Sequence, residues 1–115
     1  MINHGLQQWD GIVESAMPSE GGVVLRRFVS GENITVGRIA FEAGAVTPEH
    51  EHANEQFSLV LSGLMEFVVD GNTVMVRPGD VLHLPSGIRH GARAIEPSVV
   101  LDMFSPPRAD WVAPK

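Results

Sequence analysis

Residues 44–63, GAVTPEHEHANEQFSLVLSG, and residues 79–94, GDVLHLPSGIRHGARA, decide the fold of this chain. In the first segment, one residue separates His50 from His52, and three separate His52 from Gln56. Alternate residues of an extended strand share a face, so one strand is predicted to aim these three even-numbered side chains the same way. Glycines bound the segment, as they often do at strand ends. The pattern predicts a metal site inside a small β-barrel.

The second segment supplies a fourth candidate ligand, His90, shortly after the turn signal at 85–87. It belongs to a different strand, which the fold must bring alongside the first. We expect one divalent ion, Ni, Zn, Fe or Mn, because imidazole nitrogens and an amide oxygen suit such ions. The expected ligands are His50, His52, Gln56 and His90. Ordinary surface or core roles are the alternative, and we assign them to His4 and His83, although the sequence does not fix the face of His83.

The two segments resemble the two motifs of the cupin superfamily, G-x5-H-x-H-x3,4-E-x6-G and G-x5-P-x-G-x2-H-x3-N. The resemblance implies an all-β, single-domain cupin over residues 1–115, that is, a double-stranded β-helix or jelly-roll β-barrel. Motif 1 covers 44–63, motif 2 covers 79–94, and a C-terminal strand and tail cover 98–115. Two positions depart from the motifs: Gln56 replaces the usual glutamate, and Ala94 the usual asparagine.

Composition limits the classes of function. The chain has 115 residues, 43% of them hydrophobic, which fits one globular domain. It has no cysteine, so thiolate ligands are excluded and a reducing compartment is favoured. The N-terminus lacks the layout of a signal peptide, and no apolar run reaches the ~20 residues of a membrane span. We therefore expect a cytoplasmic protein with no membrane partner. The net charge of −6 argues against nucleic acid as a partner.

Twelve glycines and eight prolines punctuate the chain at short intervals, which indicates many short strands. One helical turn is expected at Leu6–Trp9, and a hairpin turn at Asp70–Asn72. The predicted strands are Val23–Val29, Ile34–Glu42, Val46–His50, Gln56–Ser62, Met65–Asp70, Thr73–Arg77, Val81–Leu84, His90–Arg93 and Val99–Phe104.

The strand at 56–62 carries a second pattern. If Gln56 faces the barrel interior, then Ser58, Val60 and Ser62 face inward with it, and Phe57, Leu59 and Leu61 face outward. An outward apolar row needs cover from the second sheet, from the N-terminal arm that carries Trp9, or from another subunit. We expect a homodimer that hides part of this row.

Gln56 also affects the charge of the predicted site. A glutamate ligand would leave a divalent site singly positive, whereas glutamine leaves it doubly positive and more attractive to an anion. One alternative is that the histidines alone hold the metal and Gln56 only fills space. Another is that a bulge reverses the strand and brings Glu55 to the metal.

The segment Leu101–Trp111 holds the second candidate site. Asp102 and Phe104 share a strand face by parity, and a buried carboxyl beside an aromatic ring near a metal is a candidate for proton transfer. Arg108 follows a rigid Pro-Pro step that can return it over the barrel mouth, where its guanidinium suits a carboxylate. The alternative is an edge carboxylate and a surface arginine paired with Asp110.

The H-x-H-x-x-E-Q run and the tail D-x-F-S-P-x-R-x-D-W resemble the KdgF group of cupins. The resemblance implies an enzyme of pectin and alginate breakdown that linearises 4,5-unsaturated uronates to 4-deoxy-5-keto uronates. It implies metal ligands at His50, His52, Gln56 and His90. It also implies catalytic or substrate-binding roles for Asp102, Phe104 and Arg108, with a small anionic uronate as the partner.

Other functions stay open at this stage. An iron or manganese dioxygenase is one, although O₂-activating sites more often include an anionic ligand than an amide at the position of Gln56. A non-enzymatic, ligand-sensing cupin is another. Cyanohydrin cleavage and polyketide cyclisation are further reactions for a manganese cupin.

Overall fold

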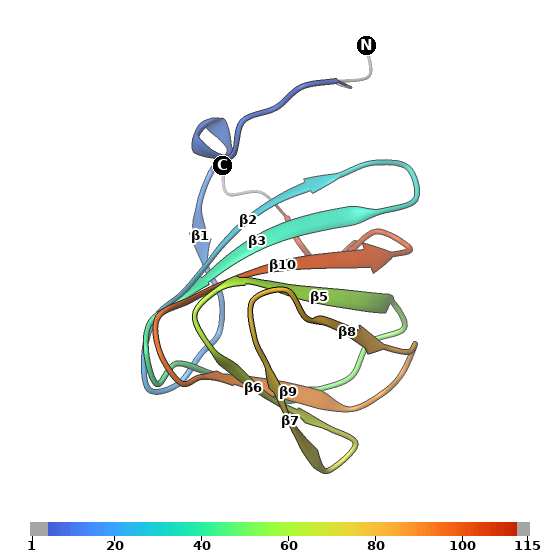
Figure 1. The fold of residues 1–115 in the computed structure, drawn as a ribbon. Coiled ribbons are helices and arrows are strands. Elements are labelled where there is room, and N and C mark those ends of the chain that lie inside the picture. Colours follow the sequence, from blue (N-terminus) through green and yellow to red (C-terminus); the bar gives the residue numbers. More distant parts are fainter. Residues whose placement is uncertain (1–4, 113–115) are drawn as a thin grey trace.

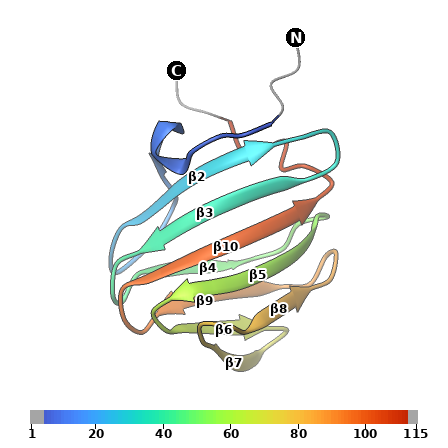
Figure 2. The ribbon, with the colours of Figure 1, turned by 45° about the horizontal axis from the view of Figure 1, so that its top comes forward.

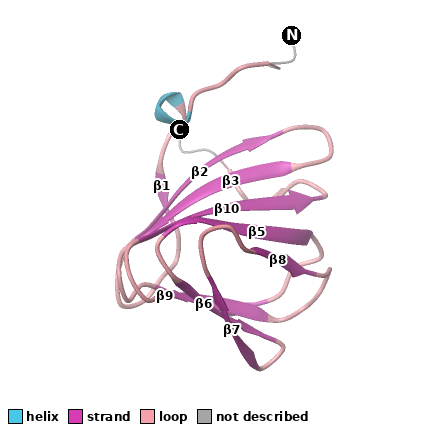
Figure 3. Cartoon of the chain, in the orientation of Figure 1, coloured by secondary structure: helices cyan, strands magenta, loops and turns pink. Residues whose placement is uncertain are grey.

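A computed structural model describes residues 5–112 of the chain and contains ten strands and one 3₁₀ turn (Figures 1 and 3). The turn, η1, covers Trp9–Gly11. The strands are β1 (Ser15–Ala16), β2 (Val24–Ser30), β3 (Thr35–Phe41), β4 (Val46–His50), β5 (Glu55–Ser62), β6 (Met65–Val69), β7 (Asn72–Val76), β8 (Val81–Leu84), β9 (His90–Ala94) and β10 (Ser98–Ser105). No helix in this described range is long or apolar enough to cross a membrane.

Two antiparallel sheets lie face to face, and the crossings between them close the sandwich into a barrel (Figures 1 and 2). One sheet has six strands in the order β1-β2-β3-β10-β5-β8, and the other has four in the order β4-β9-β6-β7. The central pairs join strands far apart in sequence, such as β3 with β10. The predicted all-β, single-domain fold is confirmed.

All nine predicted strands are present, with ends that differ by no more than two residues. The structure adds β1, a two-residue strand that pairs with β2 and is too short to carry a pattern. The helical turn lies at Trp9–Gly11, so the prediction at Leu6–Trp9 was displaced along the chain. The predicted hairpin joins β6 to β7, with positive φ at Asp70 and Gly71. This pair of left-handed residues matches the twist of the strands that it connects.

The core lies between the two sheets and follows the alternation of the strands. Along β3 every second side chain is buried, from Thr35 to Phe41. The sandwich interior collects side chains from both sheets, including Ile39, Val60, Met65 and Val100, each at most 2% exposed. Burial of such aliphatic side chains stabilises the barrel by about 1.5–3 kcal/mol each.

The two faces of β5 are as predicted at most positions. Gln56, Ser58 and Val60 are buried, whereas Phe57 and Leu61 are exposed. The prediction for Ser62 was wrong, because its side chain is exposed. The register with β10 shifts between Val99 and Val100, and such a bulge ends the simple alternation.

The outward row on β5 is not covered by the N-terminal arm. That arm is tied to β2, where Arg27 donates to the carbonyl oxygen of Trp9 at 2.8 Å and pairs with Asp10 and Glu14. His83 lies on the same outer face as Phe57, with the two rings stacked 4.6 Å apart. The chain therefore leaves this face of the six-stranded sheet partly open.

Candidate metal centre and its cavity

The four predicted ligands come from three strands and one loop. His50 ends β4 and pairs directly with His90, the first residue of β9. His52 lies in the loop that leads to β5, and Gln56 is the second residue of that strand. The prediction that one strand carries the first three was wrong. Residues 51–54 leave the four-stranded sheet and cross to the six-stranded one, so strand parity does not extend through them.

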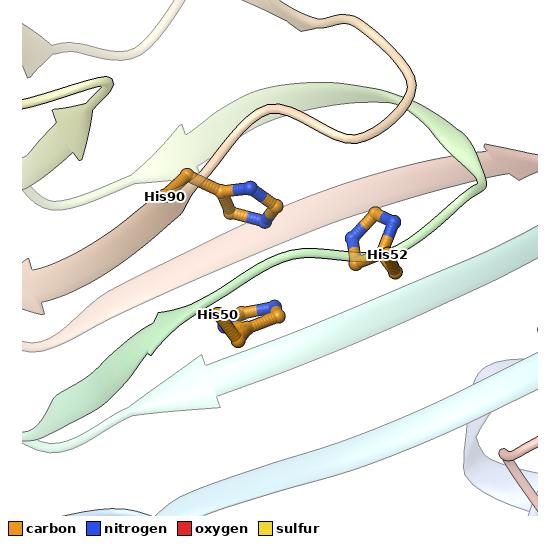
Figure 4. A group of neighbouring side chains, drawn as sticks. All are labelled: His50, His52 and His90. Atoms are coloured by element: carbon orange, nitrogen blue, oxygen red, sulfur yellow. The ribbon is translucent and has the colours of Figure 1, made fainter.

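The structure nevertheless brings the three histidines together (Figure 4). One ring nitrogen of each lies within 4.8 Å of the others. The ring centroids of His50 and His90 are 4.5 Å apart, and those of His52 and His90 are 5.0 Å apart. Three imidazoles at these separations can hold one metal ion.

Each ring is oriented by a backbone carbonyl two residues away in the chain. The Nδ1 atoms lie 2.9 Å from the carbonyl oxygens of Pro48, Asn54 and Ile88, for His50, His52 and His90 respectively. A carbonyl only accepts, so each Nδ1 carries the proton and donates it. Each Nε2 therefore keeps its lone pair for a metal, which is the arrangement found around ligating histidines.

Gln56 extends the cluster toward Asp102 through Ser58. The hydroxyl of Ser58 donates its proton to Asp102 Oδ1 at 2.6 Å. Ser58 must then accept from Gln56 Nε2 at 2.9 Å, and this fixes the amide so that Oε1 faces His52. The relay follows from the register, because Ser58 lies opposite Asp102, and Gln56 lies opposite Phe104.

One contact in this network indicates that a metal cation fits between His52 and Gln56. His52 Nε2 and Gln56 Oε1 lie 3.0 Å apart, although the other hydrogen bonds make both of them acceptors. Protonation of His52 would relieve the conflict, but burial lowers the pKa of His52, and Arg108 lowers it further. Burial also lowers the pKa of His90, to about 4. Neutral imidazoles and a facing amide oxygen fit a divalent cation bound between them.

Asp102 is the titratable group beside this cluster. It lines the same cavity as His50, Gln56 and His90. Burial raises the pKa of Asp102 to about 6, while the Ser58 hydrogen bond, Gln56 and Arg108 oppose the rise. A carboxyl that titrates close to neutral pH can both accept and donate a proton.

The tail folds back over the mouth of the barrel. Arg108 donates its backbone N–H to Thr35 at 2.9 Å, and Asn54 donates to the carbonyl of Pro106 at 2.6 Å. Trp111 packs against β3 at Gly37, where a Cβ would lie only 2.8 Å from the indole ring. Any larger residue at 37 would therefore displace the tail.

Arg108 pairs with Asp110, as the alternative interpretation of the tail predicted. Its side chain is mostly buried, however, whereas that interpretation placed it on the surface. Its Nε and Nη2 donate to the two oxygens of Asp110 at 2.9 and 2.7 Å, and its side chain is only 9% exposed. The guanidinium lies over both Phe104 and Trp111. Phe104 is 2% exposed and also contacts His52 edge-on, so it packs the arginine and the histidine together.

Two hollows share lining residues, among them His50, Arg108 and Trp111. The inner cavity has a volume of about 60 Å³ and reaches Asp102, Gln56 and His90. The outer chamber has a volume of about 480 Å³ and opens toward β2 and the tail. Sequence reasoning missed Arg26 and Trp111, which line the outer chamber. The alternation along β5 predicted correctly that Ser58 faces the interior, but nothing in the sequence indicated a role for it at the site.

Comparison with known proteins agrees with this geometry. Residues 37–104 match the model of the cupin domain family. The pectin degradation protein KdgF of Dickeya dadantii is 33% identical over 76 residues, which cover 64% of this chain and 69% of that protein. The structure of KdgF from a Halomonas species is 32% identical, with a TM-score of 0.77, and the match covers 85% of this chain and 91% of that one. An RmlC-like cupin from Shewanella frigidimarina is 26% identical, with a TM-score of 0.83 over 96% of this chain and 97% of that one.

Proposed function

The chain belongs to the cupin family and is a KdgF-like cupin, and on that premise we propose that it is a metal-dependent enzyme that linearises 4,5-unsaturated uronates. The observation that carries the proposal is the series of contacts from His52 through Gln56 and Ser58 to Asp102, in which Gln56 donates a hydrogen bond to Ser58 and Ser58 donates one to Asp102. This series supports proton transfer by Asp102 beside the candidate metal centre. Similarity to the pectin degradation protein supports the choice of substrate.

The proposed reaction is an isomerisation and needs no co-reactant. The substrate is a cyclic hemiacetal with a double bond between C4 and C5 and a carboxylate on C5. Its O1 hydroxyl loses a proton, the bond between C1 and the ring oxygen breaks, and an aldehyde and an enolate form. The enolate then gains a proton at C4 and becomes the C5 ketone. A group that moves one proton is therefore the main requirement on the protein.

Asp102 is the proposed proton carrier. Its Oδ1 accepts the Ser58 hydrogen bond, so Oδ2 is the oxygen that can exchange a proton with the substrate. Arg108 is proposed to contact the substrate carboxylate through Nη1, which makes no hydrogen bond within residues 5–112. Phe104 is proposed to hold His52 and Arg108 in place at the reacting end. When bound by His50, His52, Gln56 and His90, a divalent ion supplies Lewis acidity toward a substrate oxygen.

The sizes of the two hollows fit a monosaccharide acid. The inner cavity, about 60 Å³, has space for only a small part of a sugar ring. The outer chamber, about 480 Å³, falls in the usual range for small-molecule sites, roughly 300–1,000 Å³. A uronate would occupy the chamber and extend its reacting end toward Asp102.

The charge of the site also supports an anionic substrate. All four proposed ligands are neutral, so a divalent ion there would keep its full positive charge. In a partly dry cavity this charge attracts a carboxylate more strongly than in water. The buried position of Gln56, 5% exposed, suits such a cavity.

Deuterium incorporation tests the proposal directly. Metal-loaded protein and an unsaturated uronate are incubated in D₂O, and the product is examined by NMR. We expect a linear 5-keto product with one deuterium at C4, because the proton added there comes from an exchangeable group. Unchanged substrate would contradict the proposed function. A product without deuterium at C4 would contradict proton delivery by Asp102.

We also propose that the chain forms a homodimer through the outer face of the six-stranded sheet. Phe57, Leu61 and Val81 are 38%, 49% and 61% exposed on adjacent strands of this face. Light scattering at micromolar concentration should give twice the chain mass of 12.4 kDa, and a value equal to one chain would reject the dimer. The cytoplasm stays the proposed location, since the cysteine-free sequence fits a reducing compartment.

A further inference from the structure

Arg26 is a charged residue on the inner face of the large sheet, outside both sequence motifs. It lies on β2 opposite Ile39, which is 1% exposed in the core. Its neighbours on the same face are Val24, which is fully buried, and Phe28, which packs against the core. A cation on the interior face of a sheet is costly unless it has partners.

The guanidinium of Arg26 has few partners within the chain. Its Nε is buried and meets no acceptor within residues 5–112. Its Nη2 makes one long hydrogen bond, 3.4 Å, to the hydroxyl of Ser15. Its other contacts are aromatic, at 4.7 Å from Trp111 and 5.3 Å from Phe28. Arg26 lines the outer chamber, and its Nη1 makes no hydrogen bond within residues 5–112, so a ligand that accepts from this group would bind favourably.

The other charged groups of the outer chamber are already paired. Arg108 holds Asp110 with two hydrogen bonds. Glu49 lies 3.8 Å from Arg89, which does not line the chamber. The adjacent Arg27, on the opposite face of β2, is bound to the N-terminal arm. Among the described residues that line the chamber, Arg26 is therefore the cation that forms no salt bridge, and the Asp110 carboxylate acts on it only from a distance.

We propose that Arg26 binds the carboxylate of a sugar-acid ligand in the outer chamber, together with Arg108. The inference deepens the proposed function and rests on it for the choice of a sugar acid. Each guanidinium group lies 4.7 Å from the ring of Trp111, and all three residues line the outer chamber. The proposed carboxylate therefore lies in this chamber and accepts from the donors that the two arginines leave free. Such charge-assisted hydrogen bonds are roughly twice as strong as neutral ones. Burial and the charge of Arg108 both lower the pKa of Arg26, and a bound carboxylate would offset the repulsion from Arg108.

Calorimetric titration with D-galacturonate and D-galactose tests the proposal, because the two sugars differ only in the carboxylate. Chelator-treated protein is used, so that a metal does not contribute to carboxylate binding. The parent should prefer galacturonate. Arg26→Gln should weaken galacturonate binding about tenfold or more and leave galactose unaffected.

Arg38→Gln is the matched control, because Arg38 lies on the opposite face of the same sheet and its change removes the same charge. It should bind galacturonate like the parent. Arg26→Lys keeps the charge and the stem over Trp111 but loses the planar fork, and it should give an intermediate affinity. If Arg26→Gln does not fold, as judged by thermal unfolding, Arg26→Lys decides the question. Galacturonate affinity equal to that of the parent in the folded Arg26 variants would overturn the proposal, and so would a parent that binds the two sugars equally.

The two proposals can fail separately. A parent that does not linearise unsaturated uronate, yet binds galacturonate in an Arg26-dependent way, would reject the proposed reaction and support the carboxylate site. A parent that linearises the uronate with the same KM after Arg26→Gln would support the reaction and reject the site.

Discussion

At the inner end of the cavity, His50, His52 and His90 come from two short glycine-bounded motifs, and each ring is fixed by a carbonyl two residues away. At the mouth, Arg26 comes from β2 and meets Trp111 of the tail, on which Arg108 also rests. The inner end is therefore held by short-range hydrogen bonds. The mouth depends on tertiary packing between the two ends of the chain.

The two regions also differ in what they are suited to bind. The inner end offers neutral donors with lone pairs, an arrangement that suits a cation. The mouth offers guanidinium groups on an aromatic ring, an arrangement that suits an anion. Asp102 lines the inner cavity and is linked to Gln56 through Ser58. Substitutions at the inner end should therefore abolish metal binding. Substitutions at the mouth should weaken substrate binding and leave metal binding unchanged.

Loss of a histidine ligand should have the largest effect. His90→Ala should reduce metal retention by more than the ~10–100-fold typical of changes behind the ligands, and turnover should be lost with it. The matched control is His83→Ala, since His83 lies on the outer face against Phe57. Elemental analysis after dialysis should give about one ion per chain for the parent and for His83→Ala, but less than about a tenth for His90→Ala. Equal metal content in all three proteins would show that the cluster is not the metal site.

Asp102→Asn should separate proton transfer from metal binding. The amide keeps the shape of the side chain but cannot exchange the proton, so turnover should fall on the order of 10²–10⁴-fold. Metal content should stay at the parental level, because Asp102 contacts the ligand set only through Ser58 and the amide of Gln56. Turnover at the parental rate would exclude Asp102 as the proton carrier.

Arg108→Ala should weaken substrate binding and leave the metal content unchanged. Loss of a guanidinium that holds the carboxylate should cost roughly 2–4 kcal/mol of transition-state binding, or about 30- to 1,000-fold in kcat/KM. Arg38→Ala is a suitable control for the loss of charge, because Arg38 lies on the outer face. If Arg108→Ala changes kcat/KM no more than this control does, the substrate does not use Arg108.

Gln56→Glu should strengthen metal binding and weaken anion binding. A carboxylate ligand should retain the metal about tenfold better and bind carboxylate ligands more weakly, since it lowers the positive charge of the site. It should also disturb the relay, because Ser58 has one proton and Asp102 already accepts it. Competition with a chelator and calorimetry with galacturonate measure the two effects. Unchanged affinity for galacturonate in the metal-loaded variant would show that site charge does not control anion binding.

Asp110→Asn should have the smallest effect. The hydrogen bonds from Arg108 lower the pKa of Asp110 to about 2. A carboxyl whose pKa is lowered by folding stabilises the folded state at pH values above its ordinary pKa, which is near 4. This contribution is lost as the pH falls toward 2. Because the Asp110 side chain is 65% exposed, the contribution should be below about 1 kcal/mol. Urea unfolding at pH 7 and at pH 3 should show a small deficit for the variant that shrinks in acid; a deficit that grows in acid would contradict the pairing.

Much of the fold and the inner end could be predicted because their signals are local. Glycine and proline marked the strand ends, and alternation along β5 assigned Gln56 and Ser58 to the interior. The spacing of His50, His52 and His90 was enough to propose one cluster, although the strand between His50 and Gln56 was imagined as continuous. Spacing alone does not show where a chain leaves one sheet for another, and here it does so at 51–54.

The mouth could not be predicted in the same way. Arg26 precedes another arginine in the sequence, and only the register of β2 on β3 shows which of the two faces the core. The hydrogen bonds of Arg108 to Asp110 were considered, but not its burial against Phe104 and Trp111. The contact of Arg26 with Trp111 joins residues more than eighty positions apart, for which the sequence carries no spacing rule.

The rate at which the ring-alkene absorbance of an unsaturated galacturonate disappears tests the central claim most directly. It should be measured for the protein as purified, after chelation, and after one equivalent of a divalent ion is returned. We predict rapid loss of absorbance in the first and third samples and a rate near the uncatalysed one in the second. Equal rates in all three samples, or no loss above the uncatalysed rate with metal present, would contradict the assignment of the cluster of His50, His52, Gln56 and His90 as the metal centre of a uronate-linearising enzyme.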